Sequence, residues 1–116
     1  MQIVLGASRP QEGGMIGSVA TAGIGGFGVV GPSRIDSPVI FAPRGVSYLP
    51  AAGDSVLLLP INGRDICLGV VAPTTGLEPG EIRLTSAGGA SITLTNTGEI
   101  LLNGAEITRD GRVIGR

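Results

Sequence analysis

Side chains that could perform acid–base or nucleophilic chemistry are few in this chain and do not cluster. There is no histidine, which removes the commonest general base and metal ligand. The single cysteine, Cys67, lies between Ile66 and Leu68 in an apolar run, so we expect a small buried hydrophobe there. One thiol cannot hold zinc. The sequence therefore predicts no catalytic site, no metal site and no cofactor.

The acidic residues are spread along the chain, and local structure explains them. Four aspartates lie next to turns, where their side chains bond nearby backbone: Asp36, Asp54, Asp65 and Asp110. Three glutamates occupy similar places in a C-terminal repeat and are expected to face solvent: Glu81, Glu99 and Glu106. Opposing them to Arg83, Arg109 or Arg112 across neighbouring strands would help to fix the strand register.

A glycine-rich stretch at residues 22–28 superficially resembles a phosphate-binding loop. No helical pattern follows it, and the chain has no lysine. We therefore do not expect nucleotide binding. The longer segment from Gly13 to Ser33 is uncharged and long enough to cross a bilayer. Its many glycines instead favour two strands joined by a glycine turn.

The composition favours an all-β protein with few aromatic residues. Glycine accounts for 21 of the 116 residues without a collagen period, and aromatic residues make up 3%. A core must therefore be built from Val, Ile, Leu and Ala. The formal net charge is −1, so no positive field is available to hold a nucleic acid.

Residues 15–73 read as a compact β unit after a leader at residues 1–14, whose apolar residues 3–5 could add an edge strand. Five strands are expected, at residues 15–21, 26–31, 37–41, 55–59 and 64–72. The apolar runs at residues 56–59 and 66–71 are typical of strands covered on both sides. Asn62-Gly63 between them is a strong hairpin signal. Short strands at this spacing predict a small closed Greek-key barrel of the OB type.

A proline-bracketed linker at residues 74–80 leads to a ladder of very short strands at residues 81–116. Aliphatic residues two positions apart share one face of each strand, as in Ile82/Leu84, Ile92/Leu94 and Ile100/Leu102. The motif Gly-Glu-Ile occurs at residues 80–82 and again at 98–100, and the rungs shorten toward the C-terminus. A lone ribbon of this size buries too little surface to fold. Cyclic association with a few copies of itself would cover the apolar face.

The segment from Gly45 to Leu59, with Pro50 and Gly53-Asp54-Ser55-Val56, resembles the OB domain of central spike proteins of contractile phage tails. This family is the baseplate assembly protein V or Mu-type spike. Type VI secretion spikes and phage lysozyme spikes are similar in plan. The Leu68-Gly69 strand and the Gly-Glu-Ile ladder also resemble it, so the likeness covers about residues 15–116. It implies an OB barrel followed by a trimeric β-helical needle, a β-prism.

The resemblance implies a non-enzymatic homotrimer in the virion tail baseplate, assembled in the host cytoplasm. Its partners would be tail hub and baseplate proteins, and transiently the target outer membrane. The residues expected to pack on the trimer axis are Ile82, Leu84, Ile92, Leu94, Ile100, Leu102, Ile107 and Val113.

Two features of the family are missing here. Many spikes end in a His-x-His apex that binds iron, and this chain has no histidine, so the iron site does not carry over. The tip could be blunt, capped by a PAAR-like protein, or closed by side chains such as Ile114. The lysozyme module of some relatives is also absent.

Two alternative functions stay open. One is another tail structural role, such as a tube adaptor or a fibre tip. The other is an OB module that binds single-stranded nucleic acid, which requires stacking aromatics and a basic groove. Only Phe27, Phe41 and Tyr48 could stack.

Overall fold

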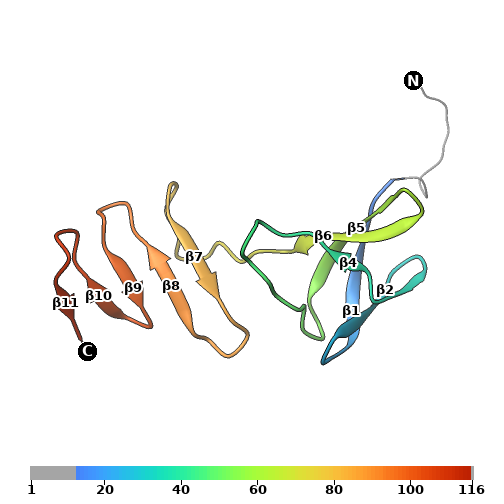
Figure 1. The fold of residues 1–116 in the computed structure, drawn as a ribbon, viewed down its shortest axis with the longest axis horizontal. Coiled ribbons are helices and arrows are strands. Elements are labelled where there is room, and N and C mark those ends of the chain that lie inside the picture. The colour runs from blue at the N-terminus through green and yellow to red at the C-terminus, as the bar shows by residue number, and fades with distance from the viewer. Residues whose placement is uncertain (1–12, 116) are drawn as a thin grey trace, which may run out of the picture. The chain divides into compact units, whose positions relative to one another are not determined.

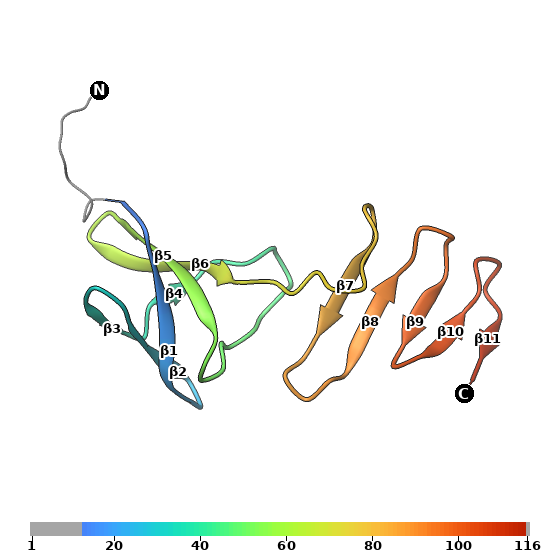
Figure 2. The ribbon, with the colours of Figure 1, turned by 180° about the vertical axis from the view of Figure 1, so that it is seen from behind.

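The computed structural model describes residues 13–115, so the expected edge strand at residues 3–5 lies outside the described residues. Within this range the chain contains strands and turns and no helix (Figures 1 and 2). The all-β class predicted from the sequence is confirmed. The chain divides into two compact units between Ala72 and Pro73. No helix of the described range has the length and apolarity needed to cross a membrane.

The first unit is a six-stranded mixed sheet with strand order β3-β2-β1-β5-β6-β4 (Figure 1). Its strands are β1 (Met15–Gly23), β2 (Gly26–Val30), β3 (Arg34–Asp36), β4 (Val39–Ile40), β5 (Ser55–Ile61) and β6 (Arg64–Val70). All neighbouring pairs are antiparallel except β4 and β6, which run parallel. The uncharged N-terminal segment thus forms two paired strands, as expected.

This sheet is open, so the closed barrel expected from the sequence is not observed in the described residues. Its two edge strands, β3 and β4, follow each other along the chain with only Ser37 and Pro38 between them. Ser37 has a positive φ of 49°, and Pro38 has no N–H to donate to a ladder. Strand geometry therefore breaks where the expected third strand should run continuously.

The main buried cluster of the first unit lies on one face of the sheet, and Ile66, next to Cys67 along β6, is buried outside that cluster. Val56 and Leu58 of β5 are fully buried, whereas Leu57 between them is 43% exposed. The expectation that this apolar run is covered on both sides is therefore wrong for the single chain, because Leu57 on its outer face stays 43% exposed. Cys67 is fully buried, as expected. The buried cluster comprises Val19, Phe27, Val29, Val56, Leu58 and Cys67.

The hairpin between β5 and β6 turns at Asn62 and Gly63, with φ of 51° and 75°. Two successive positive φ values are the signature of the tight hairpin turn that Asn-Gly favours. This prediction is confirmed.

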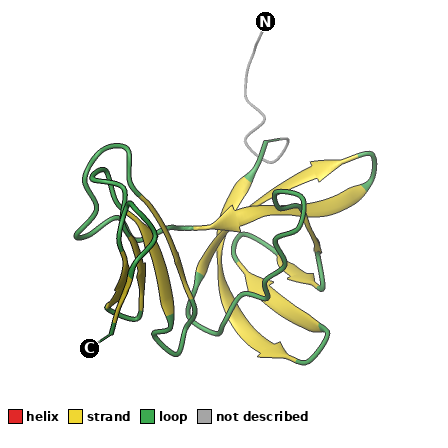
Figure 3. Ribbon diagram, turned by 60° about the vertical axis from the view of Figure 1, so that its left-hand side comes forward, coloured by secondary structure: helices red, strands yellow, loops and turns green. Residues whose placement is uncertain are grey.

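The second unit is a five-stranded antiparallel meander in the order β11-β10-β9-β8-β7 (Figure 2). Coloured by secondary structure, it consists of strands and loops (Figure 3). Its strands are β7 (Ile82–Thr85), β8 (Ser91–Leu94), β9 (Ile100–Leu102), β10 (Ala105–Ile107) and β11 (Val113–Ile114). Strand length falls from four residues in β7 and β8 to three in β9 and β10 and two in β11. The expected shortening of the rungs is confirmed.

Candidate functional site

The strand register of the second unit gathers the predicted axial residues on one face of the sheet. Directly paired residues of neighbouring strands share a face. One row across the sheet is formed by the successive pairs of Ile82, Leu94, Ile100, Ile107 and Val113. A second row is formed by Leu84, Ile92, Leu102 and Ala105. All eight residues named from the sequence therefore lie side by side, and we call this surface the aliphatic face.

The aliphatic face is largely open to solvent in the single chain. Ile82 and Leu84 are 58% and 57% exposed, and Val113 is 76% exposed. Every fully buried side chain of the described residues belongs to the first unit. The second sheet thus has regular hydrogen bonding but no core of its own. Whether a threefold axis covers this face stays a prediction.

The opposite face of the same sheet is mixed in character. It carries Arg83, Thr93, Leu101 and Glu106 in one row, ending at Ile114. The Arg83 guanidinium donates to the carbonyl oxygens of Pro73 and Thr75, at 3.2 and 3.1 Å. This side chain therefore fastens the lead-in segment to β7. Arg83, Thr93, Leu101 and Glu106 are all half-buried in the single chain, and three of the four are polar or charged, which suits this face for contact with water.

Turns at one end of the strands share a common construction. In the turn from β8 to β9, Gly98 N donates to Thr95 O, and the Thr95 hydroxyl accepts from Glu99 N. In the turn from β10 to β11, Gly111 N donates to Thr108 O, and the Thr108 hydroxyl accepts from Arg112 N. Both turns have the form Thr-x-x-Gly, with glycine φ of 95° in each. We call this the Thr-x-x-Gly turn.

Each of these turns also contacts the turn before it. Asn96 Nδ2 donates to Pro79 O at 2.8 Å, and Asn96 N donates to the Glu81 carboxylate at 3.2 Å. A side chain on Gly80 would meet Asn96 Oδ1 at 2.7 Å. One rung later, a side chain on Gly98 would meet the Arg109 stem at 2.9 Å. The second residue of each Thr-x-x-Gly turn therefore packs on the glycine of the preceding turn.

Glu99 is held by its own turn. The hydroxyls of Thr97 and Thr95 both donate to Glu99 Oε1. These bonds, with a smaller contribution from the nearby Arg109 charge, lower the pKa of the Glu99 carboxyl from its ordinary value. Hydrogen bonds that favour the charged form have this effect.

The expected cross-strand pairs between glutamate and arginine do not occur in the described range. Glu81 instead accepts from the backbone N–H groups of Glu78 and Asn96. Arg112 Nε lies 3.9 Å from Asp110 Oδ2 of its own turn. These carboxylates order turns rather than set strand register, and no sequence pattern indicates which backbone groups they meet.

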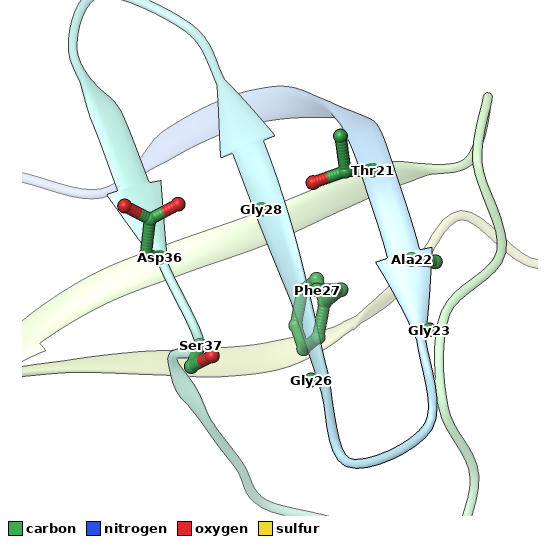
Figure 4. A pocket seen from close by; sticks show the side chains of 8 residues that line it. All are labelled: Thr21, Ala22, Gly23, Gly26, Phe27, Gly28, Asp36 and Ser37. Atoms are coloured by element: carbon green, nitrogen blue, oxygen red, sulfur yellow. The ribbon is translucent and has the colours of Figure 1, made fainter.

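The remaining chemistry of the described residues is sparse. An open recess beside the β1–β2 hairpin is lined by Thr21, Gly28, Asp36 and Ser37 among others (Figure 4). Arg34 Nε is engaged there by Asp36 Oδ1 at 3.1 Å, so the nearest cation is already paired. Burial raises the pKa of the Cys67 thiol, which disfavours a reactive thiolate. Among residues 13–115 no group of three or more His, Cys, Asp or Glu side chains could hold a metal ion.

The aliphatic face was therefore predictable from spacing, whereas the stacking of the Thr-x-x-Gly turns was not. The available signals were the repeated Thr-x-x-Gly at residues 95–98 and 108–111 and the recurrence of glycine before an aliphatic strand start at residues 80–82, 98–100 and 111–113. In comparisons with known proteins, no family model matches this chain, and no curated protein matches it significantly.

Proposed function

We propose that this protein is the homotrimeric central spike of a contractile injection machine, in which the second unit forms the piercing needle. The observation that carries the proposal is the aliphatic face: eight aliphatic side chains in register, none of them buried, on a sheet with no core. Hiding about half of such a side chain from water stabilises by roughly 1 kcal/mol. A surface of this kind calls for a partner sheet.

Identical copies are the simplest partner. Three sheets arranged around an axis bring three aliphatic faces together, and each strand row then runs along the axis. The number three follows from the resemblance to phage central spikes. The decrease from four-residue to two-residue strands would make such a prism taper toward β11. A narrowing, fully hydrogen-bonded rod suits the concentration of force on a small area of membrane.

The first unit supports the same proposal through its strand order. An OB barrel has a third strand that pairs with the second strand on one side and, in parallel, with the fifth on the other. Here β3 pairs with β2, and β4 pairs in parallel with β6. We take β3 and β4 as two halves of one third strand that is broken at Ser37-Pro38. This unit would form the collar that joins the tail hub and baseplate.

The test is the molar mass of the purified chain in solution, with two matched substitutions. Leu94→Asp places a carboxylate on the aliphatic face, so a trimer would bury three like charges around one axis. Thr93→Asp makes the same change one residue earlier on the opposite face, where Thr93 pairs with Arg83 and Leu101. We expect a trimer for the parent chain and for Thr93→Asp, and monomers for Leu94→Asp and Ile100→Asp.

Light scattering decides between the outcomes. A parent chain that is monomeric at micromolar concentration, or a trimer that tolerates both Leu94→Asp and Ile100→Asp, contradicts the proposal. If only Thr93→Asp dissociates the trimer, the interface lies on the face opposite the aliphatic face, and the proposed packing is wrong.

A further inference from the structure

Two hairpins of this protein turn on the same dipeptide with the same backbone. Asn62-Gly63 connects β5 to β6, and Asn103-Gly104 connects β9 to β10. The φ angle is 51° at Asn62 and 52° at Asn103, and both asparagines are exposed. No described atom lies within 4 Å of the place that a side chain on either glycine would take. The two turns are therefore a matched pair in sequence, backbone and access to water.

The two asparagine side chains differ in what they bond. Asn103 exchanges two hydrogen bonds with Ser91, the first residue of β8. Asn103 N donates to Ser91 O at 3.1 Å, and Ser91 N donates to Asn103 Oδ1 at 2.8 Å. The carboxamide oxygen thus takes the place that a backbone carbonyl has in a bonded strand pair. Within residues 13–115 the asparagine side chains that make hydrogen bonds are those of Asn96 and Asn103, so the Asn62 side chain is free to rotate.

An Asn-Gly pair can modify itself, because glycine has no side chain to shield its backbone nitrogen. The Gly63 nitrogen forms a bond to Asn62 Cγ, and the bond from Cγ to Nδ2 breaks. Nδ2 leaves as ammonia and takes the proton from the Gly63 nitrogen, which closes a succinimide ring. Water then opens the ring at one of its two carbonyl groups and leaves aspartate or isoaspartate. The reaction needs no reactant other than water.

We propose that Asn62 is the deamidation site of this protein and that Asn103 is shielded from the same reaction by its bond to Ser91. Rotation about the Cα–Cβ bond brings Cγ toward the next backbone nitrogen and carries Oδ1 with it. At Asn103 this rotation breaks the bond from Ser91 N, whereas at Asn62 it breaks none in the described residues. Loss of one hydrogen bond slows the attack by about fivefold.

The reaction changes both the charge and the backbone of the β5–β6 turn. Either product carries one more negative charge than the parent chain. The isoaspartyl product also lengthens the backbone by a methylene group, inside a turn that holds Ile61 opposite Arg64. The inference goes beyond the proposed spike function and does not rest on it, because each turn belongs to a single chain.

The experiment incubates the full 116-residue chain in mildly alkaline buffer, once folded and once in concentrated urea. Proteolytic fragments are then sequenced by mass spectrometry, which detects the replacement of NH₂ by OH at each asparagine. In the folded chain we expect Asn62 to react about fivefold faster than Asn103. In urea the two rates should converge. Asn96, which precedes Thr97, should be slow in both, since a side chain shields the next nitrogen.

Two substitutions of Ser91 make the test specific. Ser91→Pro removes the N–H donor at the first position of a strand, where proline is tolerated. It should raise the Asn103 rate toward that of Asn62. Ser91→Ala keeps the N–H donor and should leave Asn103 slow. Amide exchange in β9 and β10 shows whether the sheet persists in Ser91→Pro, and the comparison within the folded parent chain decides the matter if it does not.

Equal rates at Asn62 and Asn103 in the folded parent chain overturn the proposal. A faster Asn103 also overturns it, and is expected if Ser91 N stabilises the negative charge that forms on Oδ1 during attack. An Asn103 that stays slow in a folded Ser91→Pro chain contradicts the role of the Ser91 bond. Light scattering on the same samples reads the oligomeric state separately, so a monomer with a fast Asn62 and a slow Asn103 refutes the spike trimer and supports this site.

Discussion

At the scale of single residues, neighbouring leucines in β5 show how the sheet divides its environment. Leu58 is buried in the core, and Leu57 is 43% exposed on the outer face. Because successive strand residues point to opposite faces, one leucine packs in the core and its neighbour faces outward. This alternation places the β5 members of the buried cluster, Val56 and Leu58, on one face.

Leu58→Ala should lower the free energy of unfolding by about 2–5 kcal/mol, because the truncation leaves a cavity in a packed core. Leu57→Ala removes the same atoms from an exposed site, so a loss below about 1 kcal/mol is expected. Urea unfolding followed by far-ultraviolet circular dichroism measures both. Equal losses for the two variants would contradict the assigned core face.

Glu99 provides a pH-dependent prediction at the same scale. Its folded pKa is lowered, so its contribution to stability is present above the ordinary glutamate pKa and is lost as the pH falls through the lowered value. Thr97→Val removes the donor with the largest effect and should move the Glu99 pKa back toward its ordinary value. Carboxyl NMR titration of the parent and variant chains checks this. A Glu99 pKa unaffected by Thr97→Val would rule out the hydroxyl as its cause.

At the scale of elements, the Thr-x-x-Gly turns hold the second sheet in register. Each turn fixes its own ends and also packs on the preceding turn through one residue, Asn96 or Arg109. These contacts link the lead-in at Gly80 to the turn at residues 95–98, and that turn to the one at residues 108–111. Order in this sheet therefore comes from its turns as well as from its strands.

A pair of alanine substitutions isolates this turn-to-turn contact. Gly98→Ala and Gly111→Ala impose the same backbone strain, since both glycines have φ of 95°. Only Gly98 is covered, by the Arg109 stem at 2.9 Å. The free energy of protection against amide exchange in β9 and β10 should therefore fall by about 1 kcal/mol more in Gly98→Ala than in Gly111→Ala. Indistinguishable exchange in the two variants would show that the contact carries no stability.

The elements differ in how well the sequence predicts them. Asn62-Gly63 and the aliphatic pairs of the ladder follow from local rules, because turn chemistry and a two-residue period act over a few positions. The break at Ser37-Pro38 and the strand β3 at residues 34–36 were not predicted, since β3 has only one apolar residue, Ile35, and forms through pairing with β2. The contacts of Arg83 with Pro73 and Thr75 depend on folding across ten and eight residues, which no spacing rule gives.

At the scale of the whole molecule, the two units differ in what stabilises them. The first has a buried cluster with Val29, Val56 and Cys67 fully hidden from water. The second has paired strands and an uncovered aliphatic face. We therefore expect the first unit to fold alone and the second to depend on association.

Removal of the chain after Gly80 tests this division of labour. The shortened chain keeps the whole buried cluster, so it should unfold cooperatively at a temperature that does not change with protein concentration. The full chain, as a trimer, should show a transition that rises with concentration, because association stabilises only the folded state. Calorimetry over a tenfold or larger concentration range, with light scattering on each sample, measures both. A shortened chain that remains trimeric would move the assembly interface to the first unit, and a full chain without concentration dependence would leave the aliphatic face without the partner that its exposure requires.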